Sequence, residues 1–184
     1  EKLPIPMLLC IGAINTHLIN LGLRGYVSIN VQTGDALDTH SFATLIGVGA
    51  TTINPYLSFD SIYQRYIKRL FGNLSFDECV SRYIKSVNLG LLKIMSKMGI
   101  SVLSSYRGGC NFETVGLSRT IVKDYFPGTL SKISGIGLIG IEKKIKKIHK
   151  EAFETISSVL PIGGIYKYRK NGETHQYQGR LIHL

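Results

Sequence analysis

The chain has 184 residues, of which 44% are hydrophobic and 18% are charged, and its formal net charge is +10. This length predicts one domain with a possible appended piece, and this composition supports a hydrophobic core and excludes a disordered chain. No apolar run reaches the roughly 18 residues that a membrane helix needs, so we expect no membrane segment.

Helical and extended patterns alternate along the first part of the chain. Pro4 and Pro6 can open a helix, and apolar residues then recur at helical spacing until Gly22 can end it. A β-branched run predicts a strand over residues 26–31. The expected elements that follow are a helix capped by Asp38 or Thr39 and reaching about Ile46, a short strand within residues 49–54, and a helix from Pro55 to Ile67.

A long helix begins after Ser75, because Ser75 and Glu78 have the spacing of a capping box. Gly99 would end this helix, and the apolar residues after it predict a strand over residues 100–103. The expected elements that follow are a short helix from Ser118 to Tyr125, a basic helix over residues 138–153, and a β-hairpin whose strands, 164–169 and 173–177, flank Asn171-Gly172.

This order predicts an α/β fold. We expect an open layer of parallel strands and helices, similar to part of a barrel, followed by a C-terminal β-hairpin or linker. The expected boundary lies at residue 157, so that residues 1–156 form the α/β domain with its connector helices and residues 157–184 a linker. Since the chain begins at Glu1 without an initiator methionine, we expect it to be part of a longer protein.

The positive charge is concentrated in residues 143–150, where lysines alternate with isoleucines. Ile141, Ile145, Ile148 and Ala152 recur at helical spacing, which predicts a helix that buries this stripe and keeps its lysines in water. A nucleic-acid-binding protein is an alternative that the net charge invites. No zinc-finger spacing and no RNA-binding signature supports it, so we expect no nucleic-acid partner.

The cysteines and histidines do not predict a metal or redox site. Cys10, Cys79 and Cys110 are far apart and odd in number, which is typical of reduced thiols in a cytoplasmic protein. No two of the five histidines have the spacing of zinc ligands. No serine or cysteine lies in a nucleophile motif, so we expect neither a catalytic residue nor a metal in this chain.

The segment SSYRGG at residues 104–109 is the best candidate for a binding site. It follows the strand expected over residues 100–103, and parallel α/β proteins bind ligands beyond the carboxyl ends of strands. Arg107 could hold an anion, with Gly108 and Gly109 as a backbone cradle. The alternative is that Arg107 pairs with a carboxylate such as Glu113, and that the glycines only permit a close approach.

A second glycine motif, GIGLIG at residues 135–140, has the spacing of a dinucleotide fingerprint. The strand that should precede it is weak in sequence, and no acidic residue follows at the expected distance. Entry from a loop into a helix is the better interpretation.

Several long segments resemble the large subunit of glutamate synthase. These segments are IPMLLCIGAINTHLI, GLRGYVSINVQTGDALDTHSFATLIGVGATTINPYLSFDSI, YIKSVNLGLLKIMSKMGISVLSSYRGG, NFETVGLS and DYFPGTLSKISGIGL. The C-terminal GGIYKYRKNGETHQY resembles the linker that precedes the flavin barrel of that enzyme. The resemblance runs nearly end to end and in one order, and it covers the later part of the central domain and the connector.

The resemblance implies a place in a larger enzyme. Glutamate synthases convert glutamine, 2-oxoglutarate and reductant into two glutamates. Their central α/β domain joins an amidotransferase domain to a barrel that holds FMN and a three-iron cluster, and ammonia passes through an internal tunnel. The implied partners are the amidotransferase and FMN domains, with a reductase small subunit or ferredoxin as the electron donor of the parent enzyme. The resemblance does not indicate whether that donor is ferredoxin, NADH or NADPH.

The catalytic parts of the family fall outside this chain, so the resemblance implies no cofactor here and no activity in isolation. It implies that one loop contacts another domain or lines the tunnel; its residues are Ser105, Tyr106, Arg107, Gly108, Gly109 and Glu113. This loop departs from the family pattern, which continues with Ala-Gln-Ile-Phe-Glu where this chain has Gly-Cys-Asn-Phe-Glu at residues 109–113. A degenerate gene remnant and an independent anion-binding α/β module both remain open as alternatives.

Overall fold

The computed structural model describes residues 3–109, 111–154, 162–164, 167–173 and 175. The chain divides into two compact units, Glu1–Lys143 and Lys144–Leu184, and each is described by itself. The domain boundary expected at residue 157 lies outside the described residues and stays a prediction.

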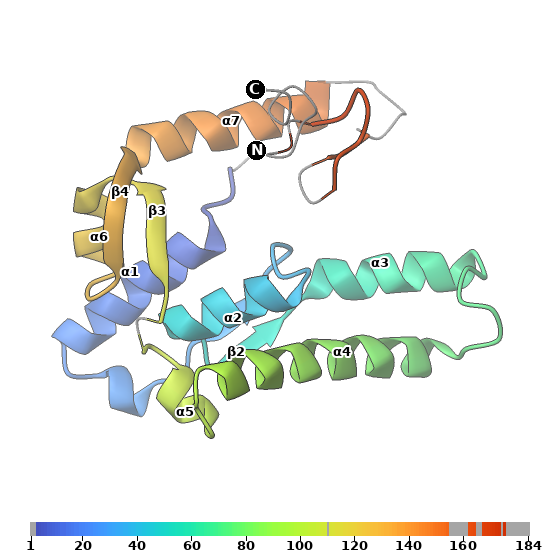
Figure 1. The fold of residues 1–184 in the computed structure, drawn as a ribbon, viewed down its shortest axis with the longest axis horizontal. Helices are drawn as coiled ribbons and strands as arrows, with labels where there is room; N and C mark the ends of the chain where they lie inside the picture. The colour runs from blue at the N-terminus through green and yellow to red at the C-terminus, as the bar shows by residue number, and fades with distance from the viewer. Residues whose placement is uncertain (1–2, 110, 155–161, 165–166, 174, 176–184) are drawn as a thin grey trace. The chain divides into compact units, whose positions relative to one another are not determined.

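The first unit is an α/β fold with small parallel sheets and, over the residues described, no closed barrel (Figure 1). Its first part contains α1 (Met7–Asn20), the 3₁₀ helix η1 (Arg24–Tyr26), β1 (Asn30–Gln32), α2 (Thr39–Val48), β2 (Thr52–Asn54), α3 (Tyr56–Ile67) and α4 (Phe76–Lys97). Its second part contains α5 (Leu103–Tyr106), β3 (Glu113–Leu117), α6 (Arg119–Tyr125), β4 (Leu130–Ile136) and the start of α7 (Leu138–Glu154).

The first sheet pairs β1 with β2 in parallel, with α2 as the crossover between them. Ile11, Val31, Leu45 and Val87 are buried together here, which joins α1, β1, α2 and α4 in one core. The sequence predicted both strands, but the first is displaced toward the C-terminus, because residues 24–26 form a 3₁₀ turn. The predicted α/β class with parallel strands is confirmed.

The second sheet pairs β3 with β4 in parallel, and α6 is the crossover. Ile121, Val122 and Phe126 of the α6 segment form its buried core. The sequence patterns missed β3 and underestimated β4, because Gly116 and Gly135 interrupt these strands and lower their strand propensity. A Cβ at Gly135 would overlap the backbone of Gly116, so these glycines let the two strands approach closely.

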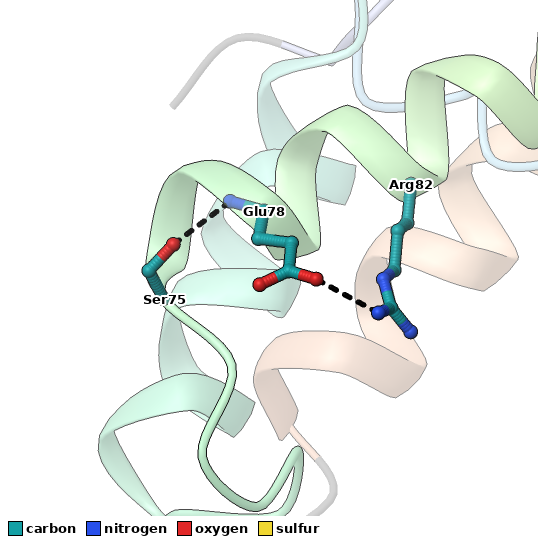
Figure 2. A network of polar contacts seen from close by, with 3 residues as sticks. All are labelled: Ser75, Glu78 and Arg82. Atoms are coloured by element: carbon teal, nitrogen blue, oxygen red, sulfur yellow. Dashed lines mark hydrogen bonds and ion pairs between the residues drawn. The ribbon is translucent and has the colours of Figure 1, made fainter.

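Helices α3 and α4 lie side by side and are joined by residues 68–75 (Figure 1). The predicted N-cap of α4 is confirmed, since the Ser75 hydroxyl accepts a hydrogen bond from the Glu78 N–H at 3.2 Å. The Glu78 carboxylate does not complete the capping box. Figure 2 shows that it turns along the helix to Arg82, whose Nη2 donates to it at 2.8 Å.

One expected strand is wrong. Residues 100–103 form no strand, and Leu103 instead begins α5, a helix of four residues. The Ile100 N–H donates to the Met95 carbonyl at 2.9 Å, so the chain after Gly99 folds back on the end of α4. This turn gives a carbonyl at the C-terminus of α4 a hydrogen-bond donor, and the residues left between Gly99 and α5 are too few to pair as a strand. The strand before the GIGLIG motif was underestimated, because β4 extends over seven residues.

The lysine-rich segment forms α7, as predicted, and Lys143, Lys144, Lys146, Lys147 and Lys150 are exposed. The expected burial of its apolar stripe is wrong for Ile148, which is 56% exposed, and for Ala152, which is also exposed; Ile141 and Ile145 are half-buried. No described residue of α7 is fully buried, so helical periodicity alone overestimated how much of this stripe the fold covers.

The predicted hairpin around Asn171-Gly172 falls partly outside the described residues, at positions 165, 166, 174, 176 and 177. The described positions contain a turn, in which the Gly172 N–H donates to the Arg169 carbonyl at 3.0 Å and Asn171 has a φ of 61°. The described residues of this segment form no strand.

Asp38 caps α2, and its replacement should give a pH-dependent loss of stability. The Ser41 hydroxyl and N–H donate to its carboxylate at 2.6 and 2.9 Å, and these bonds hold the pKa of Asp38 below its usual 3.8. A lowered carboxyl pKa stabilises the fold above the unfolded-state pKa, and this contribution is lost as pH falls through the folded pKa.

We expect Asp38→Ala to lower the free energy of unfolding by about 1 kcal/mol at neutral pH. The difference from the parent chain should shrink below about pH 4. Urea denaturation at several pH values measures it, with Asp35→Ala as a control for removing a nearby carboxylate. An equal loss of unfolding free energy at every pH would contradict the role of the ionised Asp38 carboxylate as the cap of α2.

Candidate functional site

The predicted loop begins at a buried tyrosine. Tyr106, at the end of α5, is 1% exposed and packs among Ala43, Ile46 and Met95. Its ring meets the Phe112 ring edge-on, with centroids 6.2 Å apart. Its hydroxyl has no hydrogen-bond partner among the described residues, and burial raises the pKa of Tyr106. Tyr106 is therefore the anchor that attaches the loop to α2 and α4.

Two hydrogen bonds to the Tyr106 backbone carbonyl hold the loop together. The carbonyl of Tyr106 accepts hydrogen bonds from the Gly109 N–H at 3.2 Å and from the Asn111 side-chain amide at 3.1 Å. Gly108 has a φ of 69°, a conformation that glycine adopts without strain. Phe112 then covers α2 at Gly47, where a Cβ would overlap its ring. Gly108 therefore serves the turn of the loop, and Gly47 of α2 permits the close contact between loop and helix.

A cavity of about 340 Å³ lies beside this loop, within the first unit. Its wall combines apolar side chains from α1, α2, β3 and the end of α6 with a few polar groups. The lining residues are Leu8, Asn15, Ile19, His40, Thr44, Gly47, Val48, Gly108, Phe112, Glu113, Thr114, Leu117, Phe126, Pro127 and Thr129. Its size and mixed lining suit a small molecule or a single side chain of a partner.

The structure brings only part of the predicted site to this cavity. Gly108 and Glu113 line it, whereas Ser105, Tyr106, Arg107 and Gly109 are not among its lining residues. Ser105 and Gly109 are exposed, and Arg107 is half-buried. Whether these residues contact another domain stays a prediction.

The alternative pairing of Arg107 with Glu113 does not occur. The Glu113 carboxylate lies 3.7 Å from Lys132 Nζ, because β3 and β4 are neighbours and their first residues are paired. The anion-cradle hypothesis assumed a strand over residues 100–103, and these residues form none. Anion binding by Arg107 stays a prediction. Arg107 follows a four-residue helix, and the loop leads into the start of β3.

Sequence reasoning missed the polar groups that α1 and α2 contribute. Asn15 comes from α1, and His40 and Thr44 come from successive turns of α2. Their spacing, four residues apart and followed by Gly47, puts all three α2 positions on one helix face. That pattern was a usable signal, although only the packing of α2 against the loop assigns the face to a cavity.

The remaining chemical features are few over the part of the chain that the structure describes. That part contains no group of three or more histidine, cysteine or acidic residues able to hold a metal ion. Cys10 and Cys79 are free thiols, and Cys110 lies outside the described residues. None of the helices described has both the length and the apolar character needed to cross a bilayer.

The fold and the cavity define an α/β domain with a cavity of mixed apolar and polar lining beside the Tyr106 loop. A family model described as "Glutamate synthase central domain" matches residues 1–118. The chain is 52% identical over 179 residues to a protein named glutamate synthase (NADPH) large chain from Azospirillum brasilense, and 44% identical over 181 residues to the protein of that name from Bacillus subtilis. It is 43% identical over 185 residues to a ferredoxin-dependent glutamate synthase from Pyropia yezoensis.

The chain belongs to the glutamate synthase central domain family. The three alignments cover 97%, 98% and 95% of the chain but only 12% of each relative. The similarity therefore extends beyond the family model, through the segment after residue 118, and assigns the chain to a central portion of much longer proteins.

Proposed function

We propose that this chain acts as the later part of the central domain, with the following connector, in an enzyme that makes glutamate from glutamine and 2-oxoglutarate. The observation that carries the proposal is the 52% identity over nearly the whole chain to a glutamate synthase large chain. In this role the chain is a scaffold. It holds an amidotransferase domain and an FMN-binding domain, which are its proposed partners, in a cytoplasmic enzyme.

The buried anchor at Tyr106 supports a scaffold role for the loop. The described residues of this loop are held by the buried Tyr106 ring, by hydrogen bonds to the Tyr106 carbonyl and by the contact between Phe112 and Gly47. A defined shape is what a loop needs to contact a second domain or to line a route for ammonia. The adjacent cavity, with Gly108 in its wall, is the part of the chain best suited to line that route.

The chemistry of the parent enzyme belongs to other domains in this proposal. FMN and an iron–sulfur cluster would be held outside this chain, and the electron donor, a reductase subunit or ferredoxin, would serve the flavin domain. The three cysteines at positions 10, 79 and 110 lack the close spacing that a cluster site needs, which supports this division.

The purified chain should neither hydrolyse glutamine nor retain FMN. Ammonia release from glutamine measures the first, and flavin absorbance after gel filtration measures the second. The matched control is a complete glutamate synthase large chain, which should show both under the same conditions. Stoichiometric flavin or glutamine turnover by the purified chain would contradict the scaffold role.

A further inference from the structure

The end of α3 exposes an unusual amount of apolar surface. Every residue from Tyr63 to Leu70 is exposed, and the run includes four large apolar side chains. Tyr63 is 48% exposed, Ile67 55% and Leu70 64%. We call residues 63–70 the hairpin tip, because they lead from α3 into the connection to α4 (Figure 1). Contiguous apolar surface of this kind marks interaction sites.

Two tyrosines of the hairpin tip pack against α4 although they are exposed. Tyr63 and Tyr66 both pack against Phe76, the first residue of α4, with ring centroids 5.5 and 5.8 Å apart. Rings fixed in this way lose little conformational entropy when a partner covers them. The hairpin tip is therefore an ordered aromatic surface.

The hairpin tip also carries three cations and no acid, in Arg65, Lys68 and Arg69. None of their side chains makes a hydrogen bond or ion pair with another residue that the structure describes. The first turn of α4, which contacts the hairpin tip through Phe76, carries Asp77 and Glu78, and Arg82 already pairs with Glu78 (Figure 2). The hairpin tip therefore carries positive charge that no described residue pairs.

We propose that the hairpin tip is a docking surface for an acidic, partly apolar surface of a protein partner. Tyrosine and arginine are the residues enriched at the centres of protein interfaces. A positive rim around apolar side chains complements a negative surface and orients its approach. Three cations fall short of the four to eight that typify anionic-lipid sites. The proposal does not depend on the proposed function.

The test uses the 184-residue chain and a fluorescent peptide in which glutamates alternate with leucine and phenylalanine. Arg65→Glu with Lys68→Glu removes the charge complementarity, and Ile67→Ser with Leu70→Ser removes apolar contacts without touching the aromatic rings. The control, Lys143→Glu with Lys144→Glu, makes the same charge change on exposed α7. Thermal unfolding verifies that all three variants fold.

Each hairpin-tip variant should weaken peptide binding by about tenfold or more, and the α7 variant by less than about twofold. An equal loss in the α7 variant would mean that only net charge matters and would overturn the proposal. Full binding by the serine variant would show a purely electrostatic contact and would overturn the proposal too, as would a failure of the parent chain to bind the peptide.

Vesicles of phosphatidylcholine and phosphatidylserine, and single-stranded RNA, complete the comparison. The hairpin-tip variants should not differ from the parent chain in their binding to either of these. If either binds more tightly than the peptide and loses affinity in both hairpin-tip variants, the surface recognises lipid or RNA and the protein-docking proposal is wrong.

Discussion

Tyr106→Ala should lower the free energy of unfolding by about 3–5 kcal/mol, as expected when a buried aromatic ring is removed from a core. The Tyr106 side chain fills the space among Ala43, Ile46 and Met95 and supports the Phe112 ring. Its loss would leave a cavity and release the loop that follows. Urea denaturation measures the free energy, and limited proteolysis at Arg107 should report the released loop.

Tyr106→Phe separates the ring from the hydroxyl. Because the hydroxyl is buried without a partner among the described residues, its removal should leave stability unchanged or raise it by up to about 1 kcal/mol. A loss of more than about 1 kcal/mol would mean that the hydroxyl has a hydrogen-bond partner, such as a buried water. In that case Tyr106 would have a polar role as well as a packing role.

Gly12→Val should lower the free energy of unfolding by about 3 kcal/mol through overpacking. Gly12 lies in α1 where α6 crosses it, and a Cβ there would come within 2.5 Å of the Tyr125 carbonyl oxygen and 2.6 Å of the Phe126 ring. The carbonyl belongs to the backbone and cannot rotate away. The two helices must therefore separate, which disturbs the core around Ile121 and Val122.

Gly25→Val is the matched control for Gly12→Val. Gly25 is exposed, and a Cβ there would have nothing within 4 Å. Its replacement should cost less than about 1 kcal/mol, since surface substitutions of this kind have small effects. Equal losses of unfolding free energy at the two positions would show that replacing a glycine, and not disturbing the contact between α1 and α6, causes the destabilisation.

Local signals in the sequence predicted most helices well. Asp38, Ser75 and Ser118 each cap the helix that the sequence places after them, because the capping hydrogen bond depends only on residues three positions apart. The long amphipathic α4 also ends where Gly99 predicts, with a φ of 70°. These features need no long-range contact, so a single sequence contains them.

Strands were harder to predict, because pairing partners decide them. Residues 100–103 have strand propensity but no neighbour to pair with, and they turn back onto α4. Residues 130–136 have weak propensity but pair with β3, where Gly135 allows the approach to Gly116. Strand propensity reflects how well a residue fits into a sheet, and the sequence of one strand does not show which strand it will pair with.

The sequence by itself determined the α/β class, the helix caps and the resemblance to glutamate synthase, because each depends on residue types in a local order. Only the tertiary structure decided how the SSYRGG loop is used. It buries Tyr106, pairs Glu113 with Lys132, and places Gly108, His40 and Thr44 in the wall of one cavity. These relations join residues of different helices and strands, and they follow from packing, which a local pattern does not specify.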